Sequence, residues 1–104
     1  DYDGVSPLYL ATLANQLDVV AILLDHGAQV DLADEQFTTP LMLAAQYGRF
    51  ETVRLLVEAG ADVAIRNQRD LNAVDFAGLR DSPDVKQYLH GALLDKKRLK
   101  KGTW

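Results

Sequence analysis

The sequence contains no cysteine, only three prolines, and a single tryptophan and methionine among its 104 residues. The absence of cysteine excludes disulfides, a thiolate nucleophile and cysteine ligands for zinc. No apolar run approaches the ~20 residues that a transmembrane helix requires. The N-terminus has no charged stretch followed by an apolar segment, so nothing in these residues directs secretion, and a signal ahead of residue 1 stays open. We therefore expect a cytoplasmic protein.

Residue types used in catalysis are also scarce. The two histidines are His26, next to a predicted helix end, and His90, within a polar segment, and no set of ligands has the spacing of a metal site. The chain lacks a glycine-rich phosphate loop and a serine in a nucleophile elbow. Neighbouring carboxylates such as Asp34 and Glu35 fall in predicted turns, where solvated charges are far commoner than general acids. We expect no enzyme activity, cofactor or metal ion.

The net charge of −4 is unevenly distributed along the chain. Residues 96–104 hold five of the eleven basic side chains and no acid, which leaves six basic and fifteen acidic side chains in residues 1–95. An acidic body argues against a nucleic-acid partner, because binding a phosphate backbone needs clustered Lys and Arg. The basic tail (residues 95–104) resembles a nuclear-import or polyanion-binding patch, or a weak membrane-surface anchor. We favour a solvated helix end, whose cations suit the helix dipole, and leave a nuclear location open.

Residues 1–33 and 34–66 have closely related sequences. Ser6-Pro7-Leu8 corresponds to Thr39-Pro40-Leu41, and Gly27-Ala28-Gln29-Val30 corresponds to Gly60-Ala61-Asp62-Val63. Each unit has a Ser or Thr helix cap, a proline at the first helical position and a Gly or Asn break before a second apolar stripe. Asp18 and Glu51 suit the start of that second helix. The 33-residue period predicts a repeated unit of helix, helix and extended turn.

These motifs resemble the ankyrin repeat, whose mark is a Thr-Pro-Leu-His-x-Ala box. The resemblance covers residues 1–94, as repeats at about 1–33, 34–66 and 67–94. It implies an all-α solenoid of antiparallel helix pairs with projecting turns. The sequence departs from the family pattern at the box histidine, which is Tyr9, Met42 and Asp75 in the three repeats. The turn glycine is kept only at Gly4, and since it normally allows a positive φ, we expect the turns with Phe37 and Asp70 to differ in shape.

The two ends of the expected stack differ. The third repeat keeps only an outline, and Lys86 replaces the apolar Val20 and Val53, which is typical of a polar C-terminal cap. Leu93 replaces the helix-ending glycine, so we expect the last helix to run on toward Lys97. The first repeat has no polar cap and keeps the apolar residues Val5, Leu13, Leu17, Val19 and Ile22. We expect more repeats ahead of Asp1; the alternatives are that this repeat tolerates exposure or is covered by a partner.

The resemblance implies a monomeric, non-catalytic module that binds another protein through its concave face and turn tips. The positions that ankyrin proteins use for contact correspond here to Tyr2, Asp3, Val5, Leu13, Glu35, Gln36, Thr38, Gln46, Tyr47, Gln68, Arg69, Leu71, Leu79 and Arg80. Phe37 joins this set, as an aromatic turn residue that either packs under its neighbours or anchors a partner. The alternative function is a regulatory or positioning C-terminal segment of a larger enzyme or channel.

Tyrosine and arginine dominate interface hot spots, so Tyr2 and Tyr47 are the strongest candidates for contact. The turn charges also follow an order. Acids occupy the first two turns, whereas Arg66 and Arg69 lie in the third. A partner with basic groups facing the acids and an acid facing the arginines would be oriented by this pattern. The alternative, which we favour, is that the two arginines pair with Asp34 and Asp62 in the neighbouring turn.

Overall fold

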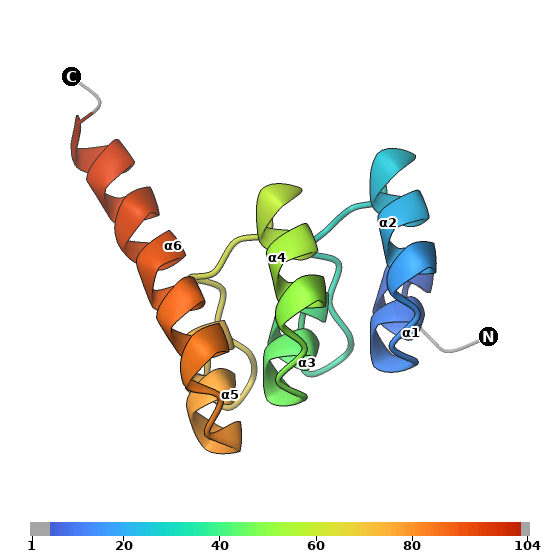
Figure 1. Cartoon of the computed structure of the whole chain (residues 1–104), viewed down its shortest axis with the longest axis horizontal. Coiled ribbons are helices and arrows are strands. Elements are labelled where there is room, and N and C mark those ends of the chain that lie inside the picture. The colour runs from blue at the N-terminus through green and yellow to red at the C-terminus, as the bar shows by residue number, and fades with distance from the viewer. Residues whose placement is uncertain (1–4, 103–104) are drawn as a thin grey trace.

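The structure, a computed structural model, describes residues 5–102, except for the side chains of Arg80 and residues 96–102. The described residues form helices and no strand, so the all-α prediction is confirmed. The helices are α1 (Pro7–Leu13), α2 (Leu17–Asp25), α3 (Pro40–Gln46), α4 (Phe50–Glu58), α5 (Ala73–Arg80) and α6 (Pro83–Gly102). The six helices of the described residues form three consecutive pairs, which lie side by side, with α1 and α2 at one end and α5 and α6 at the other (Figure 1). No helix within residues 5–102 is both long and apolar enough to cross a membrane.

The first helix of each pair begins at the cap that the sequence predicts. The Ser6 hydroxyl accepts a hydrogen bond from the Tyr9 amide at 3.0 Å, and the Thr39 hydroxyl accepts one from the Met42 amide at 3.3 Å. The third pair has no proline box, but it also begins with a cap, in which Asn72 and Asp75 each accept from the other's backbone amide at 3.0 Å. Thr39 and Met42 form the same reciprocal arrangement. All three caps satisfy amides that a helix start leaves unpaired.

Left-handed residues end the helices. Asn15 and Gly48 have φ values of 58° and 65° between the helices of their pairs, and Gly27 and Gly60 have positive φ after α2 and α4. These breaks are at the predicted positions. The last helix, α6, continues past Leu93 as expected, but ends at Gly102 rather than near Lys97. Its backbone therefore passes the expected boundary between residues 94 and 95 without interruption.

The prediction that the two turns lacking glycine differ in shape is wrong. Phe37 and Asp70 both have φ of 63°, the left-handed region that glycine favours. The same hydrogen bonds form in both turns. One oxygen of Asp34 accepts from the amides of Gln36 and Thr38 at 2.9 and 3.0 Å, and Asn67 does the same for residues 69 and 71 at 2.9 and 3.1 Å. These side-chain bonds hold the turn, so the non-glycine residues accept the strained conformation.

The helix pairs stack through an apolar core that runs along the molecule. In the middle pair, Leu41, Val53 and Leu56 are buried between their neighbours. Arg49 adds a polar link between the first two pairs, since its guanidinium donates to the carbonyls of Thr12 and Leu13, the latter at 3.2 Å. These carbonyls belong to the end of α1, where a helix lacks internal partners. The stack therefore places equivalent turns side by side.

Candidate functional site

A groove of about 410 Å³ lies along the projecting turns and the first helices of the pairs. It crosses turn 2 (residues 34–38) and turn 3 (residues 67–71) and receives side chains from α1, α3 and α5. Its lining is Tyr9, Asp34, Gln36, Thr38, Leu43, Gln46, Asn67, Gln68, Arg69 and Phe76. Polar side chains make up most of this lining, with aliphatic and aromatic groups between them. The groove is thus built by all three repeats.

Asp34 has a structural role in the groove. Besides the two amides of its own turn, its carboxylate accepts a hydrogen bond from the Tyr9 hydroxyl at 2.8 Å. Burial and then this bond to the carboxylate raise the pKa of Tyr9 to about 12. Tyr9 therefore stays protonated and ties α1 to turn 2.

The two turns are joined directly. The backbone N–H of Gln68 donates to the backbone carbonyl of Gln36 at 2.8 Å. Asn67 holds turn 3 as Asp34 holds turn 2, one 33-residue period later. The two turns consequently form a single platform that fixes the spacing of the groove's side chains.

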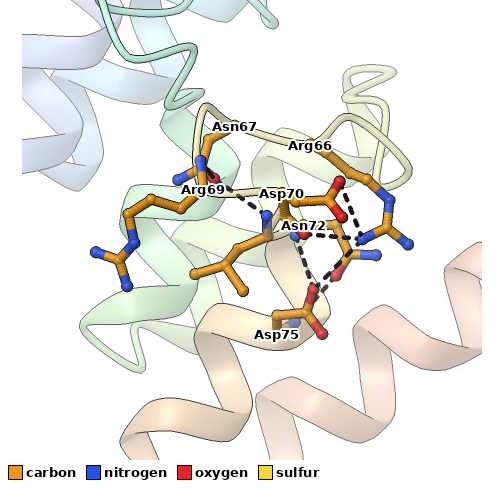
Figure 2. Close-up of polar contacts among 7 residues, drawn as sticks. Arg66, Asn67, Arg69, Asp70, Asn72 and Asp75 are labelled. Atoms are coloured by element: carbon orange, nitrogen blue, oxygen red, sulfur yellow. Dashed lines mark hydrogen bonds and ion pairs between the residues drawn. The ribbon is translucent and has the colours of Figure 1, made fainter.

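The two arginines of the third turn region have different surroundings. Figure 2 shows Arg66 within reach of two acids, whereas the Arg69 side chain extends away from them. The Arg66 guanidinium lies 3.8 Å from Asp70 and 4.0 Å from Asp75, and also donates to the Asp70 carbonyl. Arg69 lines the groove and makes no ion pair with any described residue. The expected pairing of both arginines with Asp34 and Asp62 is therefore wrong.

The residues expected to contact a partner occupy several places. Five of them line the groove: Gln36, Thr38, Gln46, Gln68 and Arg69. Phe37 is 60% exposed, and Glu35 is also exposed. The Tyr47 ring lies under the Arg49 guanidinium, 4.6 Å from ring centroid to carbon, and stays partly exposed.

The remaining members of that set that the structure describes do not line the groove. Leu13 is exposed on α1, beside a second hollow, and Leu79 is exposed on α5. Val5 and Leu71 are half-buried, and Leu71 packs against the core. Tyr2, Asp3 and the side chain of Arg80 lie outside the described residues.

Sequence reasoning missed five residues of the groove: Tyr9, Asp34, Leu43, Asn67 and Phe76. Four of these residues form two pairs at equivalent positions of neighbouring repeats, because Asp34 and Asn67, like Leu43 and Phe76, are 33 residues apart. Comparing the repeats position by position would have identified these pairs. Tyr9 stands at the box position, and no local pattern indicates its bond to a residue 25 positions away.

Among the residues that the structure describes, no three His, Asp or Glu side chains lie close enough together to hold a metal ion. The lining of the groove combines neutral hydrogen-bonding groups with the Asp34 carboxylate and the Arg69 guanidinium. Gln36, Gln46 and Gln68 each offer a donor and an acceptor, and Arg69 offers a planar set of donors.

Comparison with known proteins supports the reading of the repeats. The family described as "Ankyrin repeats (3 copies)" matches residues 1–67, well over half of the chain. No curated protein matched the sequence. The matched region contains the first two helix pairs and the glycines that follow α2 and α4, Gly27 and Gly60. Ankyrin repeats are generally protein-binding modules and typically non-catalytic. The chain belongs to the ankyrin-repeat family.

Proposed function

We propose that the protein binds an extended segment of a partner protein in the groove across turns 2 and 3, with an acidic side chain of the partner meeting Arg69. The observation that carries this proposal is the position of Arg69, a guanidinium that lines the groove without an ion pair among the described residues. The nearby Asp34 carboxylate already accepts three hydrogen bonds. A carboxylate of the partner therefore matches the one uncommitted charge in the groove.

The uncharged side chains of the lining support an extended segment. An extended peptide backbone presents alternating amides and carbonyls, and the glutamine side chains of the groove can pair with both. Leu43 and Phe76, which are only 5% and 6% exposed, form a small apolar part of the groove wall between these polar groups. A groove of about 410 Å³ accepts a few side chains rather than a folded domain.

The exposed turn residues extend this contact. Phe37 presents most of its ring to solvent at the tip of turn 2, next to exposed Glu35. Aromatic side chains supply large contact area at low entropic cost, and Glu35 favours a basic group on the partner. A segment that carries a base near Glu35 and an acid near Arg69 would bind in one direction only.

A random-peptide display selection against the purified chain tests this proposal. We expect the enriched peptides to share an acidic residue, and their affinity to fall about tenfold or more for Arg69→Gln, as expected for a lost charge-assisted pair. Selection against Arg69→Glu should enrich a basic residue at the same peptide position.

Arg66→Gln is the matched control, since Arg66 belongs to the same region but pairs with the protein's own acids. It should leave the affinity of the selected peptides nearly unchanged. Peptides without a shared acid, or equal losses in both arginine variants, would refute the role given to Arg69.

A further inference from the structure

The outer side of the first repeat exposes positions that are covered in the other two repeats. We define the leading positions as Pro7, Leu10, Val19 and Leu23 together with their equivalents 33 and 66 residues later. In repeat 2 these equivalents are all buried, and so are those in repeat 3: Pro40, Leu43, Thr52, Leu56, Ala73, Phe76, Val85 and Leu89. In repeat 1 only partial cover remains. Val19 is 37% exposed, against 3% for Thr52 and 0% for Val85.

The covering surface at both existing junctions is formed by the preceding repeat. We define the trailing positions as Leu8, Thr12 and Val20 with their equivalents in the later repeats. They are buried in repeat 1, and so are Leu41, Ala45 and Val53 in repeat 2. In repeat 3, which has no described neighbour beyond it, Val74 is half-buried, and Gly78 and Lys86 are exposed. Burial at the trailing positions therefore depends on the next repeat, and burial at the leading positions on the previous one.

The two ends of the stack are chemically different. The uncovered trailing face of repeat 3 carries a lysine, which suits solvent. All four leading positions of repeat 1 are apolar, and the hollow beside them, about 570 Å³, is lined by these residues together with Ala11, Leu13, Ala14 and Gln16. Ile22 adds further exposed apolar surface on α2. The leading face of repeat 1 thus has the composition of a covered surface.

We propose that a further ankyrin-type helix pair, joined ahead of residue 1 in the same polypeptide, packs on this leading face. At both junctions in the structure the covering pair directly precedes the covered one in the chain. The approach to α1 also matches the approach to α3, because Ser6 and Thr39 have the same extended conformation, with ψ of 160° and 163°. A second copy stacked head to tail fits less well, since it would bury Lys86 against apolar residues.

The sequence encoded ahead of Asp1 provides the first test. We expect apolar or small residues one 33-residue period before Leu8, Thr12 and Val20, within a pattern of helix, helix and turn. Charged residues at these positions, or no helical pair at all, would overturn the proposal.

A lengthened chain tests the packing itself. A second copy of residues 1–33 placed ahead of residue 1 supplies the trailing positions that already cover repeat 2. We expect the midpoint of thermal unfolding to rise by at least about 5 °C in a single transition. An unchanged midpoint would show that the leading face does not accept a helix pair.

Charge substitutions link any such gain to the face. Val19→Lys in the original chain should change the midpoint of thermal unfolding little. In the lengthened chain, the same substitution in the copy that the added repeat covers should remove the rise in the midpoint. Leu79→Lys is the matched control, because Leu79 is an exposed apolar residue on α5, and it should leave the midpoint unchanged in both chains.

Sedimentation of the original chain tests the remaining alternative, in which a second copy of the chain packs on the leading face. A dimer that forms with concentration and is abolished by Val19→Lys would assign the face to a second copy and contradict the proposal.

Discussion

At the scale of single residues, Phe37 combines exposure with backbone strain. Its φ of 63° is uncommon for a bulky side chain, and its ring is mostly in solvent. The ring therefore contributes little packing to offset the strain. Strained residues concentrate at functional sites, and this one lies at the tip of a turn beside the proposed groove.

Substitutions at Phe37 separate strain from contact. Phe37→Gly should be more stable than Phe37→Ala by about 1 kcal/mol, because alanine keeps the cost of the left-handed conformation and glycine does not. Urea unfolding of both variants measures the difference. Both should bind the selected peptides more weakly than the wild-type protein. Equal stability of the two variants would contradict the strain at this position.

Tyr9 offers a test that depends on pH. Its hydroxyl donates to Asp34, and its folded-state pKa of about 12 lies above the unfolded value of 10.0. The stability from this bond is therefore present below pH 10 and is lost as the pH rises toward 12. Tyr9→Phe should lower the free energy of unfolding by about 1 kcal/mol at neutral pH, the usual net value of one hydrogen bond.

The comparison of the two proteins across pH removes the effect of other groups. The difference in unfolding free energy between wild type and Tyr9→Phe should narrow above pH 10, where both chains lose the same lysine and tyrosine protons elsewhere. A difference that stays constant to pH 12 would contradict the raised pKa of Tyr9, to which burial and then the bond to Asp34 contribute.

At the scale of elements, two arginines at α4 have different roles: Arg49 is the N-cap residue of the helix, and Arg54 lies within it. Arg49 reaches from the start of α4 to the carbonyls at the end of α1, in the preceding repeat. Arg54 pairs with Glu51 and Glu58 on the surface of its own helix. Only the first of these contacts joins two repeats.

These arginines form a matched pair for mutation. Arg49→Met should lower the free energy of unfolding by about 1 to 2 kcal/mol, because it leaves helix-end carbonyls without their donor. Arg54→Met should have little effect, since exposed ion pairs contribute weakly and are screened by salt. Chemical unfolding measures both, and similar losses for the two variants would contradict the role of Arg49 as an inter-repeat link.

The sequence predicts the elements well wherever the signal is local. The caps at Ser6 and Thr39, the breaks at Asn15 and Gly48, and the continuation of α6 past Leu93 each follow from a few neighbouring residues. The shape of the glycine-free turns was not predicted, because Asp34 and Asn67 stabilise it through side-chain bonds that residue type alone does not indicate. The surroundings of Arg66 and the bond from Tyr9 depend on the geometry of the assembled turns and helices. The groove could therefore not be predicted from the sequence alone, because its lining comes from repeats that are brought together only in the folded stack.

At the scale of the whole molecule, the stack brings Tyr9, turn 2 and turn 3 from different repeats into one groove. The hydrogen bond between the backbone N–H of Gln68 and the backbone carbonyl of Gln36 fixes the two turns relative to each other. A platform prepared in this way loses little freedom when a partner binds, which favours affinity. The leading face of repeat 1 is a separate apolar surface at one end of the stack. The proposal for what packs on this face and the proposal for what binds in the groove can therefore be tested independently.

Mapping a bound peptide by the shifts of backbone and side-chain amide resonances tests the central claim most directly. A peptide from the display selection, added to the isotope-labelled chain, should shift the amides of turns 2 and 3 and the side-chain resonances of Gln46, Gln68 and Arg69. A peptide of the same composition in scrambled order should leave them unchanged. Shifts centred on the leading face of repeat 1 or on α6, with turns 2 and 3 unaffected, would contradict the assignment of the groove as the binding site.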